Sequence, residues 1–375
     1  MIVIARIVRG KIVLQEKIAN RQLLFMIFLV RATIAIAFLP VLTTGNAGQD
    51  AWLATIIMTF TTVALIFLVV GLGIKFPEQT IVEYSQDLLG KYPGKLITLL
   101  ILWFFLHMAA TEVRIYGELL NIAFLPRTPL VFVIGAMVFL AAITVYIGVE
   151  VLGRMADLLF PFYIFLIGIS ILLPLPELVP ENFEPVLAGG LTQVMSSALT
   201  PTAIGSQVLV VTILLPRVVE PKKGIKTIIV AFTAANLLVL LISIAVIGKL
   251  GSVEGAKAVF PFLLTIRALE LSEYIERLEI FAVLAWGMGI YISLSVYLYC
   301  GAKGLSQWFG LRDYRPLTFP MAIVWVVMAM HSFESIFQIR NFFAPEVFFP
   351  YAMTGFLPFI LLWVSYVFKK LTKSN

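Results

Sequence analysis

The sequence predicts an all-α integral membrane protein with ten transmembrane helices, arranged as two five-helix repeats of opposite orientation. Two observations predict the class. Of the 375 residues, 61% are hydrophobic and only 13% are charged, whereas a soluble domain is about half apolar and about a quarter charged. The mean hydropathy is also high, at +1.02. The third observation, the number of long apolar stretches, predicts the arrangement. We treat residues 1–375 as a single membrane domain.

Ten apolar stretches are long enough to cross a bilayer, because a span needs roughly 20 mostly apolar residues. No small-residue cleavage site follows the first stretch, so we expect it to be a retained span and not a removed signal peptide. The stretches cover about residues 21–43, 51–74, 95–124, 129–149, 151–174, 189–216, 226–249, 276–301, 316–333 and 346–368.

The basic residues predict the orientation of the spans. With the N-terminus in the cytoplasm, 19 Lys and Arg residues fall in inner segments, 6 in outer segments and 2 within spans. Cytoplasmic loops carry an excess of Lys and Arg, so we expect both termini to be cytoplasmic. The connections 76–94 and 251–274 have the pattern of short helices lying at the inner and outer surfaces, respectively.

Ten spans divide into five and five at the acidic, proline-rich connection 174–188. Because the number in each half is odd, the halves have opposite orientations, which is typical of inverted-repeat transporters. We expect the repeats to cover residues 20–175 and 188–370. In such folds the first span of each half is discontinuous near mid-membrane.

The sixth span has the composition of a discontinuous helix. Pro201 removes a backbone donor, Gly205 lowers the cost of an unwound turn, and Gln207 and several Ser and Thr residues lie around them. A proline-kinked helix with self-satisfied hydroxyls is the alternative. We favour a break that lines a cavity, because irregular backbone at this depth must be buried in protein or line a cavity.

The first span carries Arg31 near its middle, and a mid-membrane charge must face the bundle and find a partner. In the third span, Arg114 and Glu118 are spaced to form an ion pair with each other. This leaves Glu112 as the expected partner of Arg31, with Glu279 as a second choice. Two hypotheses stay open: Arg31 locks two spans together, or it is a fixed cation or carboxylate anchor at a ligand site.

Other chemistry finds little support in the sequence. There is one cysteine, Cys300, and the two histidines, His107 and His331, are far apart. We therefore expect no disulfide, no metal site and no cofactor, and the absence of a Walker-type loop or nucleophile elbow argues against an enzyme. The basic residues lie in short loops, where they set topology and contact anionic lipid, so we expect no nucleic-acid partner.

Four segments together resemble the spore-germination permease family, the B subunits of nutrient-germinant receptors, within the amino acid–polyamine–organocation superfamily. They are "QLLFMIFLVRATIAIAFLP" leading into "GQDAW", "EVRIYGELL", "ENFEPVLAGG" and "ERLEIFAVLAWGMGIYI". The resemblance covers nearly the whole chain and implies five-plus-five repeats with a nutrient site at the breaks of spans one and six. It also implies a larger membrane subunit and a lipoprotein subunit as partners, in the spore inner membrane or the cell membrane.

The resemblance further implies which residues line the nutrient site. Span one contributes four consecutive residues, span six four residues around its break, and spans three and eight one residue each from two alternatives. They are Val30, Arg31, Ala32 and Thr33; Thr200, Thr202, Ala203 and Gly205; His107 or Thr111; and Trp286 or Tyr291. The implied ligand is an amino acid.

Two functions fit this interpretation. In the first, ligand binding shifts a transporter-like pocket between two states, and partner subunits detect the shift. In the second, the chain is an amino acid permease, either coupled to H⁺ or uncoupled. A proton or sodium gradient could not act through Arg31 itself, because arginine does not lose its proton in a protein.

Overall fold

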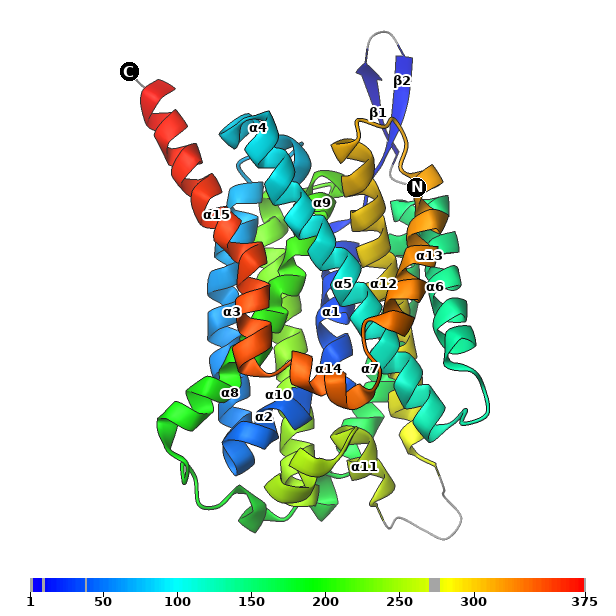
Figure 1. Ribbon diagram of the computed structural model, residues 1–375, viewed down its shortest axis with the longest axis vertical. Coiled ribbons are helices and arrows are strands. Elements are labelled where there is room, and N and C mark those ends of the chain that lie inside the picture. Colours follow the sequence, from blue (N-terminus) through cyan, green and yellow to red (C-terminus); the bar gives the residue numbers. More distant parts are fainter. Residues whose placement is uncertain (1–2, 9–10, 38, 270–276, 374–375) are drawn as a thin grey trace.

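The computed structural model describes residues 3–8, 11–37, 39–269 and 277–373, which form an elongated bundle of helices running roughly along one axis (Figure 1). The chain termini lie at the same end of the bundle, together with helix α4 (Ile81–Leu89). Helix α11 (Pro261–Arg267) lies at the opposite end. Termini at one end are what an even number of crossings produces.

Eight helical stretches of the described residues are long and apolar enough to cross a membrane, or nine if the bent pair α13 (Arg315–His331) and α14 (Ile336–Phe342) is one span. This confirms the predicted class, an α-helical multi-pass membrane protein, while the count of ten stays a prediction. The eight stretches are Leu42–Gly73, Lys91–Ala123, Leu130–Ile147, Val149–Glu177, Gly190–Arg217, Pro221–Lys257, Glu279–Trp308 and Pro345–Thr372. Their principal helices are α3 (Ala51–Gly73), α5 (Lys91–Ala123), α6 (Leu130–Ile147), α7 (Val149–Leu172), α8 (Gly190–Ile204), α10 (Gly224–Lys257), α12 (Glu279–Trp308) and α15 (Pro345–Lys373).

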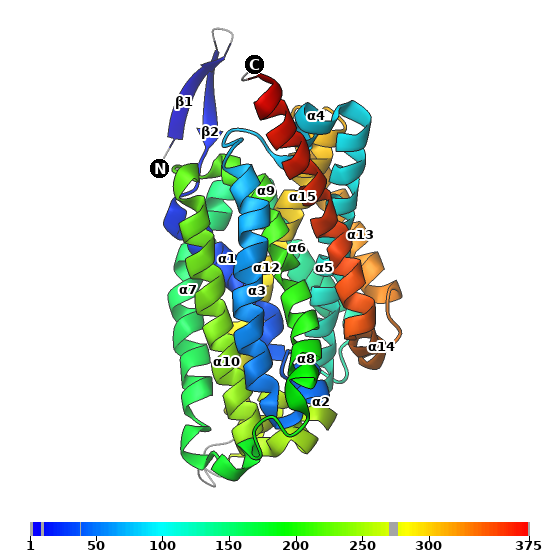
Figure 2. The same cartoon turned by 90° about the vertical axis from the view of Figure 1, so that its left-hand side faces the viewer.

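Helix α1 (Asn20–Ala37) lies in the middle of the bundle, where it packs against α10, α12 and α7. Consecutive residues such as Leu29, Val30 and Arg31 are all at most 1% exposed. A helix that is apolar on every side is buried in a core, and this explains why the sequence here has no polar face. Figure 2 shows the neighbouring row, in which α3 lies between α10 and α8.

The two predicted breaks take different forms. Helix α1 continues regularly through Val30–Thr33 and ends at Ala37, and α2 (Leu39–Ala47) follows. Span one is therefore formed by two helices, as expected of a discontinuous span, but α1 ends six residues beyond Arg31, which had been expected to line the break. In the sixth span, regular winding changes at Gly205 to a 3₁₀ helix over Gly205–Val210, before α9 (Val211–Leu214). A 3₁₀ segment keeps the backbone hydrogen-bonded in i→i+3 form.

The predicted surface helices are largely present. Helix α4 begins with a capping box, in which Thr80 and Glu83 satisfy each other's backbone amides. The backbones of α4 and α5 then approach each other closely, because a Cβ on Gly94 of α5 would lie 2.6 Å from the backbone of Gln86. At the opposite end, α11 forms part of the predicted helix within 251–274, while residues 270–276 lie outside the described residues.

An antiparallel hairpin at the N-terminus was not predicted. Strands β1 (Val3–Val8) and β2 (Lys11–Glu16) pair with Val8 opposite Lys11, and the hairpin projects from the end that carries the termini (Figure 1). Both strands are rich in Val and Ile, which favour strands. We had assigned this segment only a topological role because of its basic residues.

Candidate functional site

Arg31 is fully buried at the centre of the bundle and is held by neutral groups from three helices. Its Nε donates to Oδ1 of Asn236 on α10 at 2.8 Å, and its Nη2 contacts Sδ of Met58 on α3 at 2.8 Å. Nη2 also donates to the carbonyl of Pro201 on α8 at 3.3 Å. Phe232, one turn before Asn236, has its ring centroid 5.8 Å from the guanidinium.

The Pro201 carbonyl is available to Arg31 because of the change in winding. At Gly205 the backbone N–H bonds to Thr202 and Ala203, so it does not close the i→i−4 bond to Pro201. Helix ends leave such carbonyls without an intrahelical partner. Pro201 and Gly205, which lie four positions apart, therefore create the free carbonyl that accepts a hydrogen bond from Arg31.

Glu112 on α5 is the second buried charge of this region, with 1% exposure. Its Oε2 accepts a 2.6 Å hydrogen bond from the Ser293 hydroxyl on α12, and its Oε1 accepts a 3.1 Å bond from Nε2 of Gln207. The same nitrogen of Gln207 donates to the carbonyl of Val30 at 2.9 Å. Gln207 therefore connects Glu112 to the helix that carries Arg31.

The expected ion pair between Arg31 and Glu112 is wrong. In the part of the chain that the structure describes, Arg31 has no carboxylate partner, and Glu279, the second choice, pairs with Arg267 at 3.0 Å. The amide of Gln207 and the hydroxyl of Ser293 are the donors to Glu112 instead. The two buried charges are thus separated by neutral polar groups.

Several buried polar atoms around these two charges have no hydrogen-bond partner. Buried polar groups are nearly always satisfied, so a group of unsatisfied atoms needs an explanation. The unsatisfied atoms include one nitrogen of Arg31 and amide, hydroxyl and phenol groups from three further segments. The atoms are Nη1 of Arg31, Nδ2 of Asn236, Oε1 of Gln207, Oγ of Ser206 and the hydroxyl of Tyr297. We call this group of five residues, together with Glu112 and Ser293, the polar core.

Arg114 and Glu118 form the expected i,i+4 ion pair, at 2.8 Å, but they belong to a different place. Arg114 also donates to the carbonyls of Ala329 and Met330 at the end of α13, at 2.9 and 3.2 Å. Cations stabilise helix C-termini. This pair therefore holds the point where α13 ends before the 98° bend to α14.

The aromatic and histidine residues expected at the site lie in other surroundings. His107 Nδ1 is 2.9 Å from the Tyr351 hydroxyl, and its ring is surrounded by Trp103 and Phe342. Thr111 donates to the His107 carbonyl at 2.8 Å. Trp286 packs edge-on against Tyr116, with ring centroids 5.5 Å apart, and the Tyr291 hydroxyl is 2.5 Å from that of Thr144 on α6.

The span-six residues divide between the core and its neighbours. Thr200 donates at 2.9 Å to the carbonyl of Phe343, which lies between α14 and α15. Thr202 is 2.7 Å from the Thr61 hydroxyl on α3, and a Cβ on Gly205 would lie 3.3 Å from Thr62. In span one, Thr33 donates to the Leu29 carbonyl, while Ala32 and Ala203 are fully buried.

Three residues that bond the buried charges, Asn236, Met58 and Ser293, were not predicted from the sequence. Asn236 could have been predicted as a site residue, because it is the single amide side chain in a stretch without charged residues. Amide side chains often form hydrogen bonds between membrane helices. Met58 and Ser293 could not have been predicted as site residues, because methionine and serine are both common in membrane spans. Within the described residues, no group of three or more His, Cys, Asp or Glu side chains is placed to hold a metal ion.

A family model described as "Spore germination protein" matches residues 17–337. The chain belongs to this spore germination family. It is 29% identical over 321 residues to spore germination protein KB of Bacillus subtilis (strain 168), which covers 84% of this chain and 85% of the relative. It is 30% identical over 278 residues to spore germination protein A2 of the same organism, covering 72% and 74%.

The fold is that of LeuT-like transporters. The structure of MhsT in complex with L-phenylalanine superposes with a TM-score of 0.65 at 14% identity, covering 93% of this chain and 89% of that one. The structure of Mhp1, a nucleobase-cation-symport-1 family transporter, superposes with a TM-score of 0.59 at 12% identity, covering 88% of this chain and 75% of that one. The germination family and this fold identify a multi-pass membrane protein of the transporter or receptor kind, and not an enzyme.

Proposed function

We propose that the chain is the membrane subunit of a nutrient-germinant receptor, and that it binds a small nutrient, an amino acid, at the polar core. The observation that carries this proposal is the unpartnered Nη1 of Arg31, a permanent cation without a carboxylate in the described residues. A ligand carboxylate bound there would satisfy it with charge-assisted hydrogen bonds, which are about twice as strong as neutral ones.

The opposite charge on Glu112 supports a ligand with both charges. Glu112 accepts only two hydrogen bonds from neutral donors, and a carboxylate has about four acceptor positions. An α-amino group would bind there while the carboxylate binds Arg31. Among the residues expected from the resemblance, we retain Val30–Thr33 and Thr200–Gly205 as neighbours of this site, and we no longer place His107, Trp286 or Tyr291 in it.

The proposal includes a topology and partners. The termini share one end of the bundle (Figure 1), and the excess of basic residues assigned to that end supports its being cytoplasmic. We propose residues 20–175 and 188–370 as the two inverted repeats. We also propose the spore inner membrane as the location, with a larger membrane subunit and a lipoprotein subunit as partners that detect the ligand-dependent state.

A thermal-shift screen of the purified chain against the common amino acids tests the ligand. We expect one or a few of them to raise the unfolding temperature, because a ligand that binds only the folded state stabilises it. Asn236→Leu, which removes a neutral contact of Arg31, should weaken that response. A chain that responds to no amino acid, or equally to all of them, would refute the ligand assignment.

The second candidate function is amino acid permeation, which the transporter fold favours. The chain in liposomes, loaded with a proton or sodium gradient, separates the two functions. Because Arg31 cannot release its proton, we expect specific binding that does not require Na⁺ and no uphill uptake. Gradient-driven accumulation of a labelled amino acid would instead establish the permease.

A further inference from the structure

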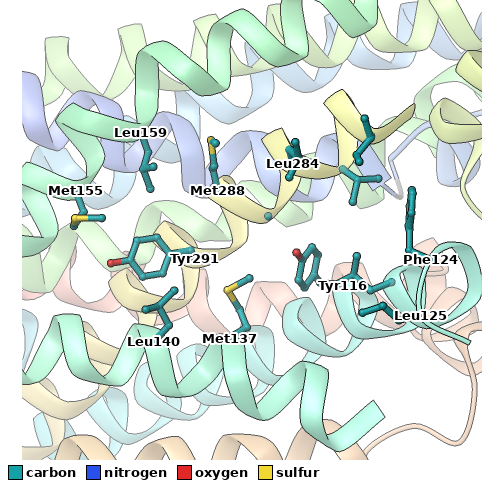
Figure 3. Close-up of a pocket in the computed structure, with 14 residues that line it drawn as sticks. Tyr116, Phe124, Leu125, Met137, Leu140, Met155, Leu159, Leu284, Met288 and Tyr291 are labelled. Carbon is teal, nitrogen blue, oxygen red and sulfur yellow. The ribbon is translucent and has the colours of Figure 1, made fainter. Parts of the chain in front are cut away.

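A pocket lies apart from the polar core, on the flank of the bundle between α5, α6, α7 and α12. Its volume is about 560 Å³, within the range of small-molecule sites. It is elongated, running from Met155 and Tyr291 at one end to Phe124 and Leu125 at the other (Figure 3). Among the described residues, no charged side chain lines it, and the only side-chain oxygens that line it are the hydroxyls of two tyrosines.

The pocket opens on a lipid-facing side of the bundle. Four of its lining residues, on α6, on α12 and just after α5, are 42–49% exposed although all are large and apolar: Leu125, Leu140, Ile280 and Leu284. In a membrane span such surface contacts hydrocarbon and not water. The pocket is therefore a groove that the acyl region of the bilayer reaches directly.

One arginine, Arg267, lies at the Phe124 end of this groove, and two further exposed arginines are close to lining residues in the sequence. The Arg267 guanidinium is 5.8 Å from the centroid of the Phe124 ring. It also pairs with the buried Glu279 at 3.0 Å, but its side chain is 41% exposed and can be reached by a further anion. Arg127 follows Phe124 by three positions, and Arg277 precedes the lining residue Ile280 by three; both are exposed. These three are half of the six basic residues assigned to outer segments. Clusters of this kind attract anionic headgroups.

We propose that the groove binds one anionic phospholipid, with an acyl chain along the line from Phe124 to Tyr291 and the phosphate at Arg127, Arg267 and Arg277. The length, the apolar lining and the basic end match the two parts of such a lipid. The bound chain contacts α12 on the face of Met288 and Tyr291, while Ser293 of the same helix bonds Glu112. The lipid thus shares one helix with the polar core, although the site does not depend on the proposed nutrient.

Photo-crosslinking in nanodiscs tests the proposal on the unmodified chain. The probe is phosphatidylglycerol with a diazirine near the end of one acyl chain, and labelled peptides are mapped by mass spectrometry. We expect saturable labelling of the groove, competed by unlabelled phosphatidylglycerol and not by phosphatidylcholine. Phe60 of α3, which is 74% exposed, reports the unspecific labelling of surrounding lipid.

Variants sharpen the test. Leu140→Trp fills the groove and should lower its labelling about tenfold, the order expected when roughly two methylenes lose their contacts. Ile143→Trp is the matched control, since Ile143 lies on α6 with 38% exposure outside the groove. The double variant Arg127→Gln and Arg277→Gln should remove the preference for phosphatidylglycerol, whereas Lys257→Gln, an exposed cation of α10, should not.

Three results would overturn the proposal. Labelling of the groove equal to that of Phe60 would show surrounding lipid only. No labelling of the groove would show that protein or another chain fills it. Equal competition by phosphatidylcholine would refute the anionic headgroup. Size-exclusion profiles of each variant separate these results from misfolding.

Discussion

The side-chain amide of Gln207 donates a 3.1 Å hydrogen bond to Oε1 of Glu112 while also bonding the carbonyl of Val30. One neutral side chain from the 3₁₀ segment therefore joins α5 to α1. The two buried charges of the core, Arg31 and Glu112, are held in the same region without being paired. This arrangement decides what each substitution in the core should do.

Replacing Gln207 by Ala should destabilise the protein by about 1–3 kcal/mol, because it leaves one oxygen of a buried carboxylate without a donor and removes the additional bond to the Val30 carbonyl. Thermal unfolding in detergent measures the loss. Gln193→Ala is the matched control, since Gln193 is an exposed glutamine on α8. Equal effects of the two substitutions would contradict the connecting role of Gln207.

Arg31→Met should give a folded protein that no longer responds to its ligand. Removing one member of a buried ion pair leaves an uncompensated charge and is strongly destabilising, but Arg31 bonds only neutral groups among the described residues. The loss of those bonds is offset because a mid-membrane charge costs about 2.5–3.5 kcal/mol to insert. Size-exclusion chromatography and ligand-induced thermal shift measure the two properties separately. Loss of folded protein would show that Arg31 is a structural lock.

Arg114→Met should cost much more, about 3–5 kcal/mol, because it leaves Glu118 unpaired and uncaps the end of α13. The side chains of this pair are only 5% and 16% exposed. Arg154→Met is the control: Arg154 also forms an i,i+4 pair, with Glu150, but is 57% exposed and should cost less than about 1 kcal/mol. Unfolding temperatures of the two variants should differ accordingly, and similar values would argue against the cap.

Gly94→Ala should destabilise the contact between α4 and α5 by about 1–3 kcal/mol, because the added Cβ would lie 2.6 Å from backbone atoms that cannot turn aside. Gly135→Ala, on α6, should instead be neutral or stabilise by about 0.5–1 kcal/mol, since nothing lies within 4 Å of its added Cβ. The unfolding temperatures of the pair should move in opposite directions. A tolerated Gly94→Ala would show that α4 is free to move away.

Composition was enough to predict the fold class, because a chain with 13% charged residues and repeated long apolar stretches has no soluble alternative. The position of the break in span six was also predictable from Pro201 and Gly205, since both act on the local backbone. The residue at which α1 ends was not predictable from the sequence. It follows Arg31 by six residues, and the charge was mistaken for the mark of the discontinuity.

The polar core was predictable only in part. Helical periodicity indicates which residues of one helix share a face, and it correctly joined Arg114 to Glu118. It does not indicate which face of another helix is opposite. Trp286 and Ser293 share a face of α12 but lie two turns apart, and only Ser293 is level with Glu112. The contact of Arg31 with Asn236 spans 205 positions, a pairing that a single sequence does not encode locally.

Neighbouring residues of α8 bind two distant parts of the molecule: the carbonyl of Pro201 accepts from Arg31, and the hydroxyl of Thr200 holds Phe343 just before α15. Helix α15, which contains Pro350 and Pro358, then runs to the end of the bundle that carries both termini (Figure 1). The binding region of Arg31 is thus connected through two hydrogen bonds and one long helix to the opposite end of that helix, which carries Lys369 and Lys370.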